Sequence, residues 1–281
     1  MKISSNIIRF HDELGLKKTI DVFSNAGFEA IDFNADLQEY YTDAHDAAFY
    51  REIKDYANAR GIVFDQTHAP FVSSFEEEDK TKQRFSEIVQ SMQHSALLGA
   101  QMIVVHPCAH LPCESETQYA AMMEYNYDFY KRLQPYAESL GIKIAIENIP
   151  TYVTGAAEGM LSLYNALGSE VFTFCFDVGH ANIKGRDPVE MIYKIGAHIG
   201  CTHIHDNDGS IDAHTLPYYG KIDWERVMQA LAEVGYVGNL NYEAGHFVRD
   251  LPIELRDKGA VYMAEVAKQL RARYMYYKSI Q

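Results

Sequence analysis

Glycines recur along this chain where a segment of helical periodicity gives way to a short β-type run. They are Gly27, Gly61, Gly99, Gly141, Gly200 and Gly235, with Gly168 near an equivalent point. A glycine in this place commonly adopts the left-handed conformation that caps a helix C-terminus. The repeating unit is roughly 35 residues long, and it predicts strands and helices in strict alternation.

Eight β-type runs follow from this repeat, at residues 2–7, 28–33, 62–67, 101–106, 142–147, 171–177, 201–205 and 237–243, with a last helix near 254–275. Alternating strands and helices require a parallel sheet, and eight such units in about 250 residues have the size of a closed (β/α)8 TIM barrel. No linker or change of composition divides the chain. We therefore predict an α/β protein with one TIM-barrel domain over residues 1–281.

A doubly wound open sheet is the alternative fold, and it normally carries a glycine-rich phosphate loop after its first strand. The residues after the first predicted strand contain no such loop, and neither G-x-G-x-x-G nor a Walker-type sequence occurs elsewhere. The barrel is therefore the better prediction, and nucleotide binding is not expected.

Composition and charge restrict the partners of this protein. The chain has 47% hydrophobic and 23% charged residues, which is typical of a globular protein. Its net charge of −14 disfavours binding to nucleic acid or to an anionic membrane surface. The four cysteines have no C-x-x-C spacing, and the sequence has no leader-like start and no long apolar run, which predicts a cytoplasmic protein without a membrane partner.

Side chains alternate between the two faces of a strand, so each predicted strand has one face toward the helices and one toward the barrel axis. In 171–177 the aromatic residues Phe172, Phe174 and Phe176 share the outer face, and Asp177 ends the inner one. Strands three to eight each end with an inward acid or imidazole: His68, His106, Glu147, Asp177, His205 and Glu243.

Three imidazoles and three carboxylates in one cavity are costly to bury unless a cation compensates them. Mixed carboxylate and imidazole ligands without a thiolate suit Mn²⁺, Zn²⁺, Co²⁺, Fe²⁺ or Mg²⁺. The sequence therefore predicts a divalent metal ion as cofactor, at the mouth of the barrel.

Eight segments, each at a predicted strand end or in the loop after it, resemble the xylose-isomerase-like barrels. This family includes sugar and sugar-phosphate isomerases and epimerases together with metal-dependent apurinic-site endonucleases. The segments are Thr67-His68-Ala69-Pro70, Val104-Val105-His106-Pro107, Ile146-Glu147-Asn148, Phe176-Asp177-Val178-Gly179-His180-Ala181-Asn182, His203-Ile204-His205-Asp206-Asn207-Asp208, Asp212-Ala213-His214, Gly220-Lys221-Ile222-Asp223-Trp224 and Tyr242-Glu243.

In ketose epimerases of this family, one metal ion is held by Glu, Asp, His and Glu from strands five to eight. The resemblance implies Glu147, Asp177, His205 and Glu243 as ligands, with Glu147 and Glu243 also serving as the catalytic acid/base pair. The choice of His205 rests on aligning the segment from His205 to Asp208 with the family pattern. His203 is then expected one layer deeper, as a supporting or packing residue.

The related endonucleases bind several metal ions at matching positions. Their additional ligands correspond to five residues that are present here, which we take as candidates for substrate binding or for a second metal: His68, His106, His180, Asp212 and His214. The resemblance thus implies one divalent ion and leaves open whether more than one is bound.

Two departures from the ketose epimerases point to a different substrate. Those enzymes carry an arginine after the strand-seven histidine motif, where this chain has Asp208-Gly209-Ser210. Strand two ends with Ile31-Asp32-Phe33, where many relatives have a glutamate.

The resemblance implies an isomerase or epimerase of a sugar or sugar phosphate that works through an enediolate, with a small molecule as its partner. The alternatives are an apurinic-site endonuclease or other phosphodiesterase, a lyase or dehydratase of sugar-like acids, and a non-catalytic sugar-binding subunit. A homo-oligomer and the phosphorylation of the sugar both stay open.

Overall fold

The computed structural model describes residues 1–150, 152–249 and 251–281. Its eight strands are all parallel and follow the order β7-β6-β5-β4-β3-β2-β1-β8. Their bounds are β1 Ile3–Asn6, β2 Ala30–Phe33, β3 Val63–His68, β4 Met102–Val105, β5 Lys143–Glu147, β6 Phe172–Asp177, β7 Ile199–His203 and β8 Leu240–Tyr242. A parallel bridge between Ile204 and Tyr242 joins β7 to β8. The strands thus form a nearly closed barrel, and the predicted fold class is confirmed.

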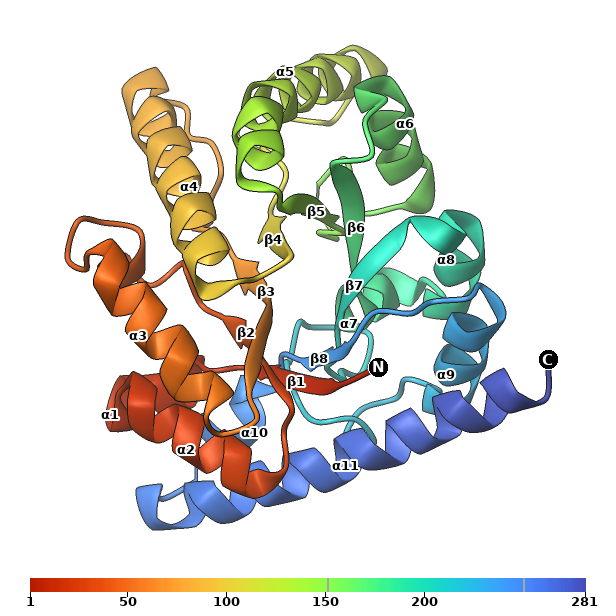
Figure 1. Ribbon diagram of the computed structural model, residues 1–281. Helices are drawn as coiled ribbons and strands as arrows, with labels where there is room; N and C mark the ends of the chain where they lie inside the picture. Colours follow the sequence, from red (N-terminus) through yellow and green to blue (C-terminus); the bar gives the residue numbers. More distant parts are fainter. Residues whose placement is uncertain (151, 250) are drawn as a thin grey trace.

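Helices surround this barrel (Figure 1). They are α1 Ile8–Leu14, α2 Leu16–Ala26, α3 Ala47–Asn58, α4 Glu78–Leu98, α5 Glu116–Leu140, α6 Ala157–Leu167, α7 Val178–Asn182, α8 Pro188–Ile195, α9 Trp224–Glu233, α10 Gly245–Arg249 and α11 Ile253–Ser279, with short 3₁₀ turns η1 Gln38–Tyr40, η2 Ile183–Gly185 and η3 Gly196–His198. In the described ranges, none of these helices has both the length and the apolar character needed to cross a membrane.

The predicted role of the recurring glycines is confirmed at most of the helix ends. Gly99 ends α4 with a φ of 86°, in the left-handed region that favours glycine. Gly200 is different, because it lies within β7 rather than at a helix end. A Cβ there would come within 2.4 Å of Thr173 Oγ1, so a close approach between strands explains this glycine. The prediction that Gly200 caps a helix was wrong, and β7 begins two residues earlier than expected.

The outer face of the barrel is apolar, as strand alternation predicted. Ile144 and Ile146 of β5 and the three phenylalanines of β6 are buried in the main hydrophobic core, between strands and helices. The barrel interior has two different halves. The half made by β4 to β7 contains a small apolar cluster of Val104, Ala145, Cys175 and Cys201, with Met102 packed against it.

The other half of the interior, made by β8, β1, β2 and β3, is polar. Asp32 accepts hydrogen bonds from Gln66 and Asn241, and Asp65 accepts hydrogen bonds from Ser4 and Asn239, so hydrogen bonds link these polar side chains. A shift of register between β2 and β3 at Ile31 and Asp32 is a β-bulge, in which Asp32 pairs with Gln66 and the intervening Asp65 has no partner on β2. The bulge brings both Asp65 and Gln66 into this network.

Candidate metal centre

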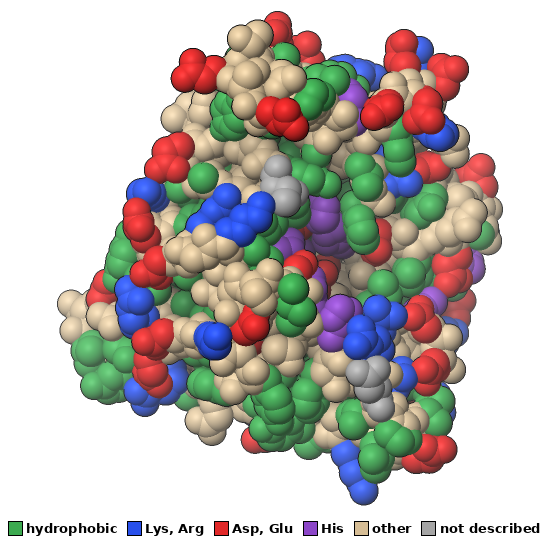
Figure 2. All heavy atoms as spheres, turned by 180° about the vertical axis from the view of Figure 1, so that it is seen from behind, with side chains coloured by type: hydrophobic (Ala, Val, Ile, Leu, Met, Phe, Trp, Pro, Cys, Tyr) green, Lys and Arg blue, Asp and Glu red, His purple; other side chains and the backbone are tan. Residues whose placement is uncertain are grey.

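The carboxyl ends of the strands place acids and imidazoles together at one end of the barrel. His68, Glu147, Asp177 and His203 are the last residues of β3, β5, β6 and β7, and all four are buried. His106 and Glu243 directly follow β4 and β8. Figure 2 shows histidine side chains gathered in the central hollow of the face that it presents.

The innermost group consists of Glu147, Asp177, His203 and Glu243, whose ligand atoms all lie within 4.8 Å of one another. Nδ1 of His203 is 3.2 Å from Glu147 Oε1, 3.3 Å from Glu243 Oε2 and 3.7 Å from Asp177 Oδ2. Burial alone would lower the pKa of His203, but the Glu243 and Glu147 carboxylates raise it well above its ordinary value. One imidazole nitrogen and three carboxylates converging in this way make a compact set of donors for a divalent ion.

The structure places His203, and not His205, in this innermost group. His203 is in register with Asp177 of β6, so the two side chains stand at the same level of the barrel. His205 points to the same side but lies one residue pair further toward the mouth, where its Nε2 is 3.0 Å from Asp177 Oδ1. Because β7 begins earlier than predicted, the position expected for His205 is occupied by His203.

His205 belongs to a second group with His180, Asp212 and His214, again with ligand atoms within 4.8 Å of one another. Asp212 Oδ2 lies 3.2 Å from His180 Nε2 and 3.0 Å from His214 Nε2. Burial raises the pKa of Asp212, but hydrogen bonds from the two histidines bring it well below its ordinary value. Burial lowers the pKa of His214, but Asp212 and Glu243 raise it to about 9.

The third group consists of His68, His106 and Glu147. Glu147 Oε2 is 2.9 Å from His106 Nε2 and 3.4 Å from His68 Nε2. Burial opposes ionisation of Glu147, but His203 and His106 hold its pKa well below the ordinary value. Glu147 is therefore shared between two of the three groups.

These residues fit a bound divalent ion. Within the described ranges, Nδ1 of His205 is buried without a hydrogen-bond partner, and Oε2 of Glu147 has none of good geometry although His106 Nε2 lies 2.9 Å away. Buried polar atoms are normally satisfied, and orphaned ones at the convergence of carboxylates and imidazoles are accounted for by a cation. The nine residues predicted for the site are divided among the three groups, with His203 added to them.

Several residues that support the site carried no role in the sequence analysis. Asn148 holds Asp177 in place, because its side chain donates to the Asp177 carbonyl at 2.8 Å and accepts from the Asp177 N–H at 2.7 Å. Phe71 is 53% exposed and stacks on the His106 ring at a centroid distance of 5.2 Å. Asn148 directly follows Glu147 in the sequence, whereas nothing in the local sequence marks Phe71.

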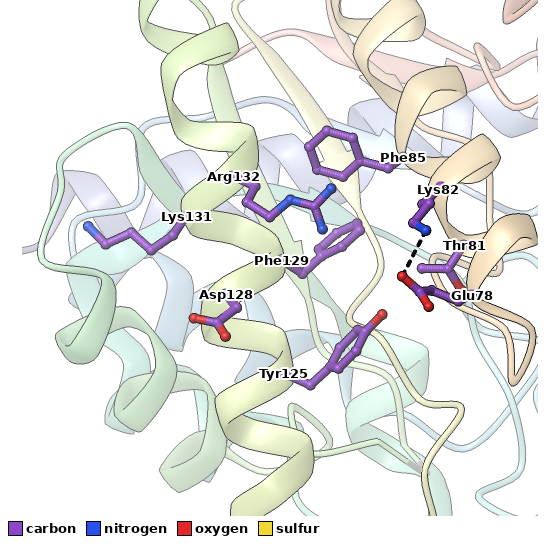
Figure 3. Close-up of a pocket in the computed structure, with 9 residues that line it drawn as sticks. All are labelled: Glu78, Thr81, Lys82, Phe85, Tyr125, Asp128, Phe129, Lys131 and Arg132. Carbon is purple, nitrogen blue, oxygen red and sulfur yellow. Dashed lines mark ion pairs between the residues drawn. The ribbon is translucent and has the colours of Figure 1, made fainter.

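A separate groove of about 560 Å³ lies between α4 and α5 (Figure 3). Phe85, Tyr125 and Phe129 line it together with the Glu78–Lys82 ion pair, and the Arg132 guanidinium lies 4.3 Å from the centre of the Phe85 ring. The lining residues that are described include none of the residues in the three groups. The groove is therefore distinct from the candidate metal centre.

Comparison with known proteins agrees with this fold. A sequence model described as a xylose isomerase-like TIM barrel matches residues 20–267. The protein MJ1311 of Methanocaldococcus jannaschii is 28% identical over 212 residues, covering 73% of this chain and 71% of that protein. A D-psicose 3-epimerase of Enterocloster bolteae is 21% identical over 232 residues, covering 79% of this chain and 74% of the epimerase.

Two solved structures show the same architecture over nearly the full length. A D-tagatose 3-epimerase-like protein superposes with a TM-score of 0.80 and 22% identity, covering 98% of this chain and 99% of the other. The IOLI protein, solved with a bound zinc atom, superposes with a TM-score of 0.78 and 21% identity, covering 99% of both chains. At these identities the likeness shows a shared fold.

Proposed function

The chain belongs to the xylose isomerase-like TIM barrel family, and from this premise we propose that it is a divalent-metal-dependent epimerase or isomerase of a sugar or sugar phosphate. The observation that carries the proposal is the innermost group, in which carboxylates from β5 and β8 and the His203 imidazole meet within 4.8 Å. The similarity to a D-psicose 3-epimerase adds support, because that enzyme acts on a ketose.

Glu147, Asp177, His203 and Glu243 would hold the ion. When bound to a carbonyl and its neighbouring hydroxyl, such an ion acidifies the C–H bond next to the carbonyl. The protein's own residues would then move the proton. The low pKa of Glu147 keeps its carboxylate ionised, as a general base requires.

Glu147 and Glu243 come from different strands, β5 and the end of β8, and approach His203 Nδ1 at 3.2 and 3.3 Å. Two carboxylates on different sides of one substrate carbon allow one to remove a proton and the other to deliver it, which inverts a stereocentre. Delivery of the proton to the neighbouring carbon gives aldose–ketose isomerisation instead. In this mechanism His180, which lies beside Glu147 and Asp212, would bind sugar hydroxyls.

A test incubates the purified protein with a panel of free and phosphorylated ketoses in D₂O, with Mn²⁺ and with a chelator. We expect one substrate class to take up deuterium next to the carbonyl with Mn²⁺, and the chelator to abolish the uptake. Metal-loaded protein that exchanges no proton of any sugar would contradict the proposal.

A metal-dependent phosphodiesterase is a second candidate, favoured by one observation. Three groups of possible ligands adjoin, and Glu147 belongs to two of them, an arrangement suited to several ions. The net charge of −14 opposes binding to a nucleic-acid duplex, so we place this function second. Cleavage of an abasic duplex in the same panel, with steep loss of binding as salt rises, would reverse the order.

A further inference from the structure

His203 is fully buried, and its two ring nitrogens face different surroundings. Nδ1 faces the carboxylates of Glu147 and Glu243. Nε2 faces away from them and lies 3.4 Å from Oδ2 of Asp32, on β2. A neutral imidazole has one N–H and one lone pair, so these surroundings decide which nitrogen is free to bind an ion.

Asp32 is only 2% exposed, and its orientation is fixed by two amides. Oδ2 accepts a hydrogen bond from Asn241 Nδ2 at 2.7 Å and another from Gln66 Nε2 at 3.2 Å. An oxygen that accepts two hydrogen bonds in this way is not the protonated oxygen of a carboxylic acid. The face that Asp32 presents to His203 is therefore an acceptor.

An acceptor beside Nε2 favours the tautomer in which Nε2 carries the hydrogen. The lone pair of the neutral ring then lies on Nδ1, among Glu147, Glu243 and Asp177. The opposite tautomer would set the Nε2 lone pair against the Asp32 carboxylate, which is repulsive in a buried environment.

We propose that Asp32, held by Gln66 and Asn241, is a positioning residue that fixes the His203 tautomer and so presents Nδ1 to the divalent ion. The inference rests on the metal dependence in the proposed function, and it goes beyond that function by assigning a role to the polar half of the barrel interior. Asp32 belongs to none of the three ligand groups, so it would not bind the ion directly. It acts through His203 alone.

A purely structural role makes a different prediction from this one. If Asp32 served only to satisfy the amides of Gln66 and Asn241, its loss would lower stability and leave the intrinsic affinity for the ion unchanged in the folded protein. Among the described residues, Oδ1 of Asp32 and Nε2 of His203 both lack a well-formed hydrogen bond, so satisfying the two amides does not by itself account for the place of this carboxylate beside the ring. Ion affinity and stability must therefore be measured separately.

The experiment measures Mn²⁺ and Zn²⁺ binding by equilibrium dialysis for the wild type, Asp32→Ala and Asp32→Asn. Asp65→Asn is the matched control. Asp65 lies in the same polar half, with Ser4 Oγ at 3.1 Å and Asn239 Nδ2 at 2.7 Å. It also accepts a hydrogen bond from the backbone N–H of Gln66 at 3.0 Å, but not from either of the side-chain amides that hold Asp32. Circular dichroism and thermal unfolding establish that each variant is folded.

We expect Asp32→Ala to weaken ion binding by about 10- to 100-fold, the usual effect of removing a carboxylate behind a metal-binding histidine. Asp32→Asn retains a carbonyl oxygen that can accept from Nε2–H, so its loss should be smaller. Asp65→Asn should bind within about twofold of the wild type. Equal losses in Asp65→Asn and Asp32→Ala would overturn the proposal, because the effect would then be a general one on the interior.

A second readout uses ¹⁵N-labelled histidine in the Zn²⁺-loaded wild type and requires no substitution. Long-range ¹H–¹⁵N spectra should show His203 with a hydrogen on Nε2 and Nδ1 bound to zinc. A hydrogen on Nδ1 would overturn the proposal even if Asp32→Ala failed to fold. In Asp32→Asn the same tautomer should persist.

The outcomes also separate this inference from the proposed function. Tight ion binding by a protein that converts no sugar, with the expected loss in Asp32→Ala, would refute the function and support the positioning role. Conversion of a sugar together with unchanged ion binding in folded Asp32→Ala would refute the positioning role alone. A wild type that binds neither ion would refute both.

Discussion

The two halves of the barrel interior contain different kinds of side chain, although both lie beneath the same cluster of acids and imidazoles. Below Glu147 and Asp177, on β4 to β7, the interior is filled by Val104, Ala145 and neighbouring cysteines. Below Glu243, on β8 and β1 to β3, it is filled by hydrogen-bonded carboxylates and amides. Apolar packing therefore supports the ligands of one half, and directed hydrogen bonds support those of the other.

In the apolar half, ligand positions depend on close packing and on backbone contacts. Asp177, for example, is held through main-chain hydrogen bonds to Asn148. Packing fixes where a side chain stands, but it does not select a protonation state. In the polar half, hydrogen bonds of fixed direction do select it, because each donor requires an acceptor opposite.

The largest effect is expected where the two halves meet. Glu147→Gln and Glu243→Gln each keep the shape of the side chain and remove one partner of the acid/base pair, so each should lower turnover at least about 100-fold while the fold is retained. Steady-state kinetics on the substrate found in the panel measures this. Glu225→Gln is the control, at a half-buried glutamate of α9 that pairs with Arg273 and belongs to none of the three ligand groups. Wild-type turnover in both Glu147→Gln and Glu243→Gln would contradict their assignment as the acid/base pair.

A change in the apolar half should affect stability and not the ion. Val104→Ala removes two buried methyl groups and leaves a cavity, at a cost of about 2 kcal/mol in the free energy of unfolding. Its affinity for Mn²⁺ should stay within about twofold of the wild type. Urea unfolding and equilibrium dialysis give the two numbers, and a large loss of affinity would show that packing alone orients the ligands.

The reverse is expected in the polar half. Asn241→Ala removes the 2.7 Å hydrogen bond to Asp32, which loosens the carboxylate behind His203. We expect about tenfold weaker Mn²⁺ binding and a loss of about 1 kcal/mol in stability. A variant that loses stability while binding Mn²⁺ normally would remove the difference between the two halves.

A smaller effect concerns pH and the metal-free protein. Burial lowers the pKa of His68 and that of His214, but the hydrogen bonds that these rings donate to Glu147 and Asp212 outweigh it and raise each pKa to about 9. A histidine with a raised pKa stabilises the fold fully below its unfolded value, near 6.5, and this contribution is lost as pH rises through about 9.

Thermal unfolding of the metal-free protein should therefore show a melting temperature that falls by a few degrees between pH 6.5 and 9. His68→Gln and His214→Gln should each flatten this dependence. A melting temperature that rises over the same interval in the wild type would contradict the assigned protonation states.

Side-chain alternation along strands sufficed to predict much of this molecule. It separated the outer phenylalanines of β6 from the inner Asp177, and the inner cluster of Val104, Ala145 and Cys175 follows the predicted faces. The rule works here because parallel strands buried on both faces leave little freedom in how a side chain points.

The same rule could not distinguish His203 from His205, since residues two apart point to the same side. Their levels depend on how β7 is aligned with β6. The register shifts beside Gly200, which lies close to Thr173, a residue far from it in the sequence. Asp32 was also beyond prediction. Its role depends on amides from β3 and β8, which only the closed barrel brings to it.

Closure through β1 and β8 has a consequence for how this protein is made. Ser5 Oγ on β1 donates to the carbonyl of Tyr242 on β8, so β1 can complete its pairing only after β8 has been synthesised. At translation rates of about 5–20 residues per second, the edge of β1 stays without its neighbour for tens of seconds. During that interval the nascent chain exposes an unpaired strand edge. Such an edge can form hydrogen bonds with other chains, and chaperones cover surfaces of this kind.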